Sequence, residues 1–391
     1  MRYRAYIILA AAILIELLIG ATLGWGAFVP LIIKYYGYSA VRSQMIFSVT
    51  IVVFSLSIFG YGRVIGRIGE RVLLLGGSLL YILAYAMASL WGGSYPMLLL
   101  SIGVLASTGV SAIYLALLQL CVSEFCDRAG TVTGALVAGY GLGAFIIAYL
   151  IRLVAAQGYD IGQVFIGISL FYGLPVLLLN LLIVKLYRPA CPVAAETTVT
   201  GRTGTDAYTA ALMAAMMAST LSGYAILSNI ALMVKSVGLP AVSVAPAIAL
   251  FAVGNSGGRL VWGAVSDAVG AHRAIVLSFV LQAVLLFFLG NTTGYNPLLP
   301  VAVLVAGAGF GANLVLYPAR IKEHYGVENL GGIYSVVFLA TAVSGFAGPF
   351  LGGWAYEHFG NYLLAMRLIF LVLILGFIVY AASSRSGPDA G

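Results

Sequence analysis

One arginine stands out in the stretch FAVGNSGGRLVWGAVSD, which covers residues 251–267. Arg259 is surrounded by apolar and small residues, and no acidic residue occurs in this stretch before Asp267. A guanidinium keeps its charge in proteins, and its planar fork of donors matches a carboxylate bidentately. Arg259 therefore predicts an anion-binding site; a buried ion pair that holds parts of the fold together is the alternative.

Glu16 is the second charged residue deep inside an apolar segment. Gly20, Leu23 and Ala27 follow it on the same face of a helix, at i+4, i+7 and i+11. Glu16 could accept a proton or pair with Arg259. It could also be a neutral carboxyl group bonded to a neighbouring helix, because burial disfavours the charged form.

Other polar and apolar residues at similar depth could line the same cavity. Each could instead bond or pack against a neighbouring helix, and aromatic core packing is the alternative for Phe310. Asn255 shares the helical face of Arg259, four residues away. With Arg259, the candidates for substrate contact are Tyr140, Asn255, Tyr114, Asn313, Thr341, Leu23 and Phe310.

The composition places these residues in a membrane. Of the 391 residues 62% are hydrophobic and only 8% are charged, whereas soluble domains carry about 25% charged residues. Only helices and closed barrels span a bilayer, and barrel strands alternate apolar with polar residues. The long apolar runs, near the ~20 residues that a spanning helix needs, predict an all-α membrane protein.

Twelve such runs can be placed along the chain. Arg259 lies eight residues, or ~12 Å, from Asp267 at one end of its run, deep in a core about 30 Å thick. Exposure to lipid would be costly there, so its side chain is expected to face the bundle interior or a wet cavity. The runs are 6–33, 40–66, 71–91, 96–122, 131–157, 162–187, 208–236, 240–266, 270–290, 296–323, 329–357 and 361–383.

Basic residues predict the orientation of the chain. With both termini in the cytoplasm, thirteen lysines and arginines fall on the cytoplasmic side and five on the outer side. The outer five are Lys34, Arg42, Arg152, Lys235 and Arg367. We expect a multi-pass protein of the cell (inner or plasma) membrane. The net charge of +7 follows from this asymmetry and does not indicate nucleic-acid binding.

A polar stretch and an internal repeat divide the chain into halves. We expect a six-helix bundle over 1–187, a cytoplasmic linker over 188–207 and a second six-helix bundle over 208–391. An offset of 201 residues aligns Gly62 with Gly263 and Gly69 with Gly270, and it also aligns Tyr140 with Thr341. Two parallel repeats around a midplane site are an architecture of secondary transporters.

The pattern Gly263-x-x-x-Asp267-x-x-Gly270-x-x-Arg273 resembles the loop signature of the major facilitator superfamily, although Gly66 takes the acidic position in the first-half copy. The stretches LGWGAFVPLI, GYGLGAFI, GGRLVWGAVSD and GPFLGGWAYEHFGNY are similar to the monocarboxylate porter and oxalate/formate antiporter branch. This resemblance implies that Arg259 binds a substrate carboxylate. The exchanger subgroup has a lysine in helix eleven where Thr341 stands. Animal monocarboxylate porters have an aspartate where Asn255 stands.

We therefore expect a secondary active transporter of small monocarboxylates such as lactate or pyruvate, with proton-coupled symport by alternating access. The alternatives are an oxalate/formate-type anion exchanger and a proton-coupled drug antiporter, which Glu16 would suit. The expected partners are a small carboxylate, a proton and the lipid bilayer. The sequence leaves the oligomeric state open, and a monomer is compatible with it. The sequence has no P-loop pattern, no histidines at metal-ligand spacing and no enzyme motif, so we expect neither a cofactor nor catalysis.

Overall fold

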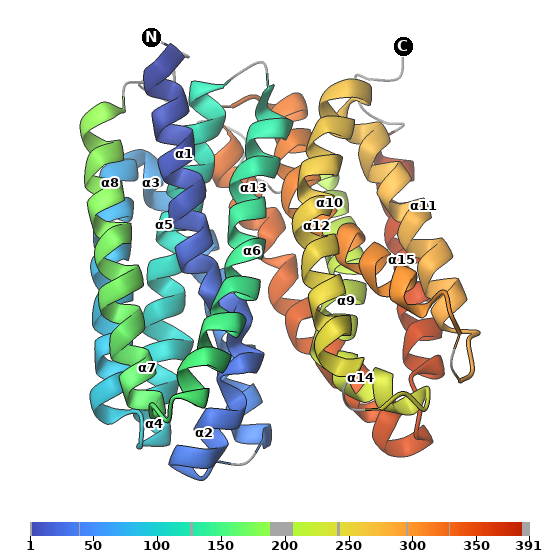
Figure 1. Ribbon diagram of the computed structural model, residues 1–391. Helices are drawn as coiled ribbons and strands as arrows, with labels where there is room; N and C mark the ends of the chain where they lie inside the picture. The colour runs from blue at the N-terminus through green and yellow to red at the C-terminus, as the bar shows by residue number, and fades with distance from the viewer. Residues whose placement is uncertain are drawn as a thin grey trace. The chain divides into compact units, whose positions relative to one another are not determined.

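A computed structural model of the chain describes residues 2–38, 40–125, 128–187, 206–240, 243–294, 296–327 and 329–384. The described residues form helices and no strands, as predicted (Figure 1). The chain divides into two compact units, Met1–Thr198 and Val199–Gly391. Residues 188–205 of the predicted linker 188–207 lie outside the described residues, so the linker stays a prediction.

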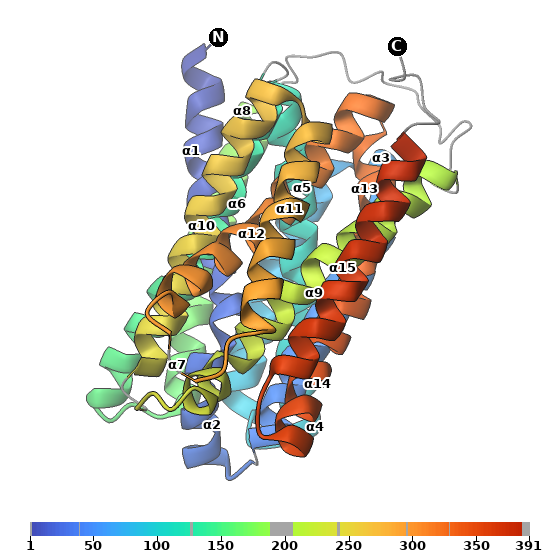
Figure 2. The same cartoon turned by 90° about the vertical axis from the view of Figure 1, so that its right-hand side faces the viewer.

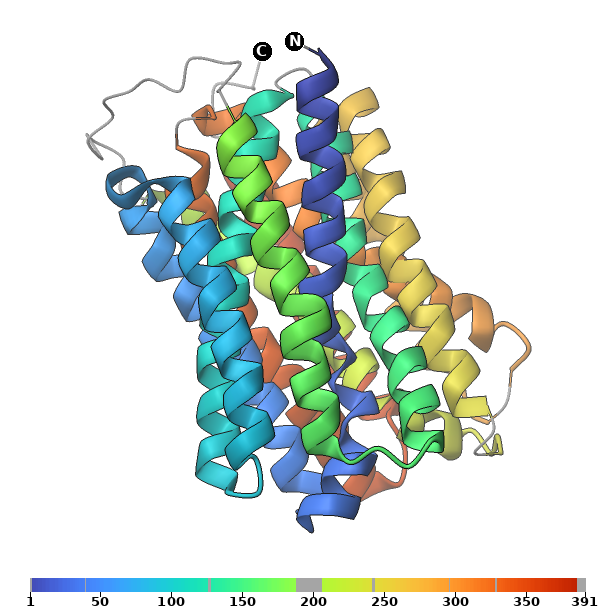
Figure 3. The ribbon, with the colours of Figure 1, turned by 60° about the vertical axis from the view of Figure 1, so that its left-hand side comes forward.

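The first unit consists of apolar helices interrupted by short stretches of tighter or wider helix. Its elements are α1 (Arg2–Ile19), the 3₁₀ helix η1 (Gly20–Ala27), α2 (Val29–Tyr36), α3 (Ala40–Trp91), α4 (Tyr95–Leu98), the π-helix η2 (Leu99–Ala106), α5 (Ser107–Glu124), α6 (Ala129–Ala156), α7 (Ile161–Ile168), the π-helix η4 (Ser169–Gly173) and α8 (Leu174–Leu186). We call the end at which α1 begins and α8 ends the near end of this unit, and the opposite end the far end (Figure 3).

The second unit repeats this pattern with fewer interruptions. Its elements are α9 (Ala207–Ser236), α10 (Val244–Val269), α11 (Ala271–Leu289), α12 (Leu299–Tyr325), α13 (Leu330–Phe338), α14 (Ala340–Phe359) and α15 (Leu363–Ser384). Its near end is where α9 begins and α15 ends. The connections α9–α10, α11–α12 and α14–α15 lie at its far end (Figure 2).

Eleven helical spans within the described ranges are long and apolar enough to cross a membrane, against twelve predicted segments. The difference lies in α3, which joins the predicted segments 40–66 and 71–91 in one span, Met45–Trp91. A straight helix of these 47 residues would be ~70 Å long, more than twice the thickness of a bilayer core. Gly69, at φ 77° and ψ 158°, breaks it. The chain then turns back, since the Tyr95 hydroxyl donates to the Arg42 carbonyl at 3.3 Å.

Helix one also differs from the prediction, because the expected segment 6–33 is divided into α1, η1 and α2. Glycines explain the tightened stretch η1. A Cβ at Gly20 would collide with the Tyr140 carbonyl of α6, and one at Gly24 would collide with the Ile147 side chain. The absence of these side chains lets η1 lie directly against α6, so van der Waals packing can hold the helices together where lipid weakens the hydrophobic effect.

The internal repeat is confirmed by backbone geometry. Gly69 and Gly270, which are 201 residues apart, have φ values of 77° and 87° and ψ values of 158° and 148°. The same offset relates Gly37 to Gly238, whose φ values are 69° and 79°. Side chains strongly disfavour positive φ, and glycine adopts it without that cost. Both halves therefore need glycine at the same two connections.

Helix pairing repeats as well. The helices α1 and η1 pack on α6 in the first unit, as α9 packs on α14 in the second, and α3 packs on α5 as α10 packs on α12. The contact between Gly24 and Ile147 has its counterpart at the same offset in the contact between Ala225 and Gly348. The predicted fold class of two six-helix repeats is thus confirmed.

Candidate functional site

Arg259 lies in the middle of α10 and is completely buried. It is fifteen residues from Val244 and ten from Val269, which corresponds to ~22 Å and ~15 Å along the helix. The apolar span Pro246–Val269 contains it. The charge therefore sits at membrane depth and inside the protein, as expected for an intramembrane arginine that serves a site.

A seam of glycines brings α12 against α10 at this point. A Cβ at Gly258 would lie 2.5 Å from the Ala308 Cα, and one at Gly307 would lie 2.8 Å from the Asn255 nitrogen. At Gly311 a Cβ would lie 3.0 Å from the Cγ of Arg259 and 3.1 Å from the Oδ1 of Asn255. The stem of Arg259 thus crosses α12 over Gly311, and Asn255 lies beside it, as their spacing predicts.

Aromatic side chains cover the same region. The ring of Phe310 meets Tyr224 of α9 edge-on at 5.0 Å between centroids, and it lies 6.0 Å from the ring of Phe251. Tyr224 is close enough to Arg259 for the two groups to interact electrostatically. The second unit therefore brings Arg259, Asn255 and Phe310 together.

Tyr224 and Gly311 were not among the residues selected from the sequence. Tyr224 had a usable signal, because the repeat offset of 201 residues relates it to the candidate Leu23. The sequence gives no such signal for Gly311, because the importance of this glycine depends on the side chain of α10 that crosses it.

Asn313 and Thr341 occupy other parts of the second unit. Asn313 follows Gly311 by two residues, about 200° around α12, and its amide donates to the Gly309 carbonyl at 3.4 Å. It borders a small void with Ser278 of α11 and Tyr317. Thr341 is buried at the start of α14, where its hydroxyl donates to the Phe338 carbonyl at 2.7 Å. Their predicted contact with substrate stays a prediction.

In the first unit Tyr114 and Tyr140 form an aromatic cluster with Phe54 of α3. The centroids of the two tyrosines are 5.9 Å apart, and Phe54 lies 5.7 Å from Tyr114 and 6.3 Å from Tyr140. Phe54 was not selected from the sequence, although the repeat offset relates it to Asn255. Leu23 is half-buried in η1.

Glu16 is completely buried in α1 and faces α6. A Cβ at Gly139 would lie 3.5 Å from the Cβ of Glu16. Glu16 also interacts electrostatically with Cys121 of α5. Within the first unit, α5 and α6 are thus the neighbours of this side chain. A pair with Arg259 would join the two units, and it stays a prediction.

Comparisons with known proteins agree with this architecture. The model of the Major Facilitator Superfamily matches residues 211–389. The uncharacterized MFS-type transporter YhjX of Escherichia coli K12 is 28% identical over 320 residues, which cover 77% of this chain and 76% of YhjX. The oxalate:formate antiporter of Oxalobacter formigenes is 23% identical over 99% of this chain and 92% of its own length. The proton:xylose symporter XylE has a solved structure that superposes with a TM-score of 0.74, at 14% identity over 96% of this chain and 94% of XylE.

The second half of the chain matches the Major Facilitator Superfamily, and the whole chain is similar to transporters of this superfamily. It is a multi-pass membrane transporter.

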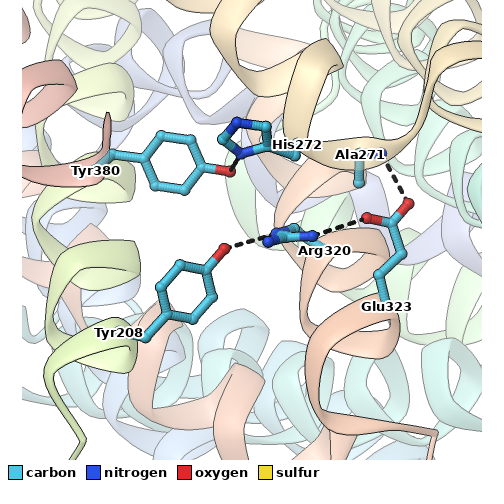
Figure 4. Close-up of polar contacts among 6 residues, drawn as sticks. All are labelled: Tyr208, Ala271, His272, Arg320, Glu323 and Tyr380. Carbon is cyan, nitrogen blue, oxygen red and sulfur yellow. Dashed lines mark hydrogen bonds and ion pairs between the residues drawn. The ribbon is translucent and has the colours of Figure 1, made fainter. Parts of the chain in front are cut away.

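A polar network at the near end of the second unit surrounds the superfamily loop signature (Figure 4). The Nε of Arg320 donates to the Tyr208 hydroxyl at 2.6 Å, and its Nη1 lies 3.4 Å from the Oε2 of Glu323. The Oε1 of Glu323 accepts the backbone N–H of Ala271 at 2.8 Å. Because Ala271 is the first residue of α11, this carboxylate of α12 caps the positive end of another helix.

The same network reaches α15. The Nδ1 of His272 lies 2.9 Å from the Tyr380 hydroxyl, so the start of α11 is tied to the end of α15 (Figure 4). Glu323 and Tyr380 thus fix the segment that follows Gly270 of the signature. Of the described residues, no three histidines, cysteines, aspartates or glutamates are grouped as metal ligands. In the second unit, the polar residues near the signature thus connect helices to one another.

Proposed function

We propose that this protein is a secondary active transporter of small organic monocarboxylates and that Arg259 binds the substrate carboxylate. The observation that carries the proposal is the complete burial of this guanidinium halfway along a membrane-spanning helix. A charged side chain at this depth usually marks a substrate or ion site. A bound carboxylate would match both the charge and the planar fork of donors of the guanidinium.

The surroundings of Arg259 support a small substrate with an apolar part. Phe310, Phe251 and Tyr224 provide aromatic surface, and Gly311 lets the stem of Arg259 lie directly against α12. Asn255 adds a buried amide on the same face, 6% exposed. Apolar walls with a few placed polar groups are typical of small-molecule sites. Alternating access would follow from rocking of the two repeats around the site.

Proton coupling is assigned to Glu16 in this proposal. It is buried and lies at membrane depth, and the aspartate of animal monocarboxylate porters is replaced by Asn255, which cannot titrate. Acidic side chains at membrane depth are typical of proton relays in pumps and transporters. In the rival interpretation, Glu16 is a structural group and the proton needs no side-chain carboxyl.

The proposed location is the cell membrane, with the near end of each unit in the cytoplasm. The basic residues support this orientation. Arg4, Arg128, Arg273 and Arg320 lie at near ends, whereas Arg367 lies at the far end of the second unit. Cytoplasmic loops carry the excess of lysine and arginine in membrane proteins.

A second candidate is an anion exchanger of the oxalate/formate type. It is favoured by the oxalate:formate antiporter of O. formigenes, which matches along 99% of this chain. Thr341 argues against an exchanger, because it occupies the position at which the exchanger subgroup has a lysine as its second cation. The helices α13 and α14 contain no lysine. One cation matches one carboxylate, so a monocarboxylate transporter remains the first candidate. A proton-coupled drug antiporter is the third candidate, and Glu16 is the residue that supports it.

Uptake into proteoliposomes tests the proposal. Labelled lactate, pyruvate, acetate, formate and oxalate are offered separately, with and without a pH gradient and with and without oxalate or formate inside. Monocarboxylate uptake that follows the pH gradient without internal anion is the expected result. Uptake that requires internal oxalate or formate would establish the exchanger instead.

The variant Arg259→Gln tests whether Arg259 is the anchor, that is, the residue that binds the substrate carboxylate. Two lost charge-assisted hydrogen bonds at about 1.5–3 kcal/mol each would weaken binding ~10²- to 10⁴-fold. Arg259→Lys keeps the charge but loses the planar fork, so we expect strong impairment. Arg63→Gln, an exposed arginine at the near end of the first unit, is the matched control and should transport normally. Uptake by Arg259→Gln equal to that of the control would refute the anchor.

A further inference from the structure

A cavity of about 620 Å³ lies at the far end of the second unit, between α9, α10, α12 and α15 and the loop after α11. We call it the far-end pocket. Its lining extends from the helix residues Ile226, Leu250 and Ala306 to the connections at Leu239 and Gly294. These connections are found at the bottom of Figure 2. This volume falls within the range of about 300–1,000 Å³ that is usual for small-molecule sites.

The lining of the far-end pocket contains no charged side chain among the described residues. Most of it is aliphatic, with Met233 on α9 and Met366 on α15. The nearby Arg367 is turned to the loop, where it donates to the Gly290 carbonyl at 2.8 Å and to the Asn291 side chain at 3.3 Å. Nothing in the described lining would compensate the charge of a carboxylate or a phosphate.

Most of the polar side chains of the lining are already engaged with the protein. The hydroxyls of Thr292 and Ser236 donate to the Phe288 and Met233 carbonyls, each at 2.8 Å. The Asn361 amide donates to the Phe359 carbonyl at 2.9 Å, and its oxygen accepts the N–H of Leu363 at 3.1 Å. Engaged donors cannot replace the water lost by a polar ligand, so they select against hydrogen-bond acceptors.

The pocket is distinct from the region of Arg259. On α12 its lining ends at Ala306, and Gly311 lies five residues, or ~7.5 Å, further along the helix. Phe310 and its neighbours Phe251 and Tyr224 occupy the interval. One place in this unit thus suits an anion, and another suits an uncharged apolar molecule.

We propose that the far-end pocket binds an uncharged, apolar small molecule at a site separate from the carboxylate site. The occupant is a free molecule, because a phospholipid would bring a phosphate to a mouth whose described lining has no charged group to meet it. Such a molecule would touch α9, α10, α12 and α15 together and would brace the far end of the unit. This inference does not depend on which anion the protein carries.

Photolabelling of the full-length protein in phosphatidylcholine nanodiscs tests this site. The probes are a neutral alkyl aryl diazirine and its carboxylate analogue, and mass spectrometry locates the labelled residues. We expect saturable labelling of Met233 or Met366 by the neutral probe and none by the analogue. Excess lactate should not compete, and Arg259→Gln should be labelled like the wild type. Labelling that fails to saturate, or that lactate displaces, would overturn the separate site.

Two variants fill the pocket, and one serves as their control. Ala306→Phe and, on α10, Ala247→Phe introduce a ring into the cavity and should each abolish saturable labelling. Val301→Phe makes a similar enlargement on α12, but Val301 is 55% exposed and does not line the pocket, so its labelling should be unchanged. Unchanged labelling in whichever filled variant folds would refute the proposal. Native mass spectrometry that detects a phospholipid in the wild type, but not in that variant, would also refute it.

Discussion

Gly311→Ala tests whether the seam between α10 and α12 positions the guanidinium of Arg259. The substitution adds one methyl group at the point where the arginine stem crosses α12. That methyl would lie 3.0 Å from the Arg259 Cγ and 3.1 Å from the Asn255 Oδ1, and closer still to the Asn255 carbonyl oxygen. The carbonyl belongs to the backbone of α10, so no change of rotamer can remove this contact.

The size of the effect follows from these distances. To reach an ordinary contact of 3.4 Å, the Arg259 stem must move by about 0.4 Å, and the Asn255 carbonyl, with the backbone of α10, must move further. Overpacking of this kind costs ~1–3 kcal/mol, partly offset by the ~0.5–1 kcal/mol that alanine contributes to a helix. We expect a small loss of stability. For transport we expect KM to rise about ten-fold, because a displacement of 1 Å at a reacting or binding group can cost about 10²-fold.

The assay is carboxylate uptake against concentration in proteoliposomes, with thermal unfolding measured in parallel. Gly257→Ala is the matched control, because Gly257 lies on α10 two residues before Arg259 but on the exposed face, and a Cβ there meets nothing within 4 Å. It should leave KM unchanged and the stability equal or slightly higher. If Gly311→Ala transports with the KM of the wild type, the glycine seam does not position the anchor.

Two further predictions concern the other buried or capping carboxylates. Glu16→Gln should still bind the monocarboxylate but should lose accumulation driven by a pH gradient, as measured in proteoliposomes; accumulation equal to that of the wild type would exclude Glu16 as the coupling group. Glu323→Gln keeps an oxygen acceptor for the Ala271 N–H but loses the negative charge at the start of α11 and the ion pair with Arg320. The free energy of unfolding, measured by thermal unfolding, should therefore fall by about 0.5–2 kcal/mol, and KM should be unchanged. A raised KM at unchanged stability would instead place Glu323 in substrate handling.

Several features of this protein follow from its sequence alone. The scarcity of charge and the long apolar runs require membrane-spanning helices, because a bilayer leaves backbone groups no other partners. The offset of 201 residues identifies the repeat, and the glycines at 69 and 270 adopt the same positive-φ conformation in both halves. Arg259 could also be found in this way, since a charge in an apolar run is rare and the helical rise gives its depth.

The positions of side chains around helices were decided only by tertiary structure. Asn255 and Phe310 lie with Arg259, whereas Asn313, at a similar depth, faces α11. Depth depends on the number of residues along a helix, and the sequence supplies that number. The direction in which a residue faces depends on which helix packs against it.

The sequence also does not reveal which distant residues lie next to Arg259. Tyr224 is 35 residues away and Gly311 is 52 residues away, and both reach it through packing of α9 and α12 on α10. The far-end pocket likewise arises where four helices and a loop leave space between them, and none of its aliphatic lining residues is unusual in the sequence. Local sequence determines helices and their depth, but close packing between distant segments determines which groups meet and where a cavity remains.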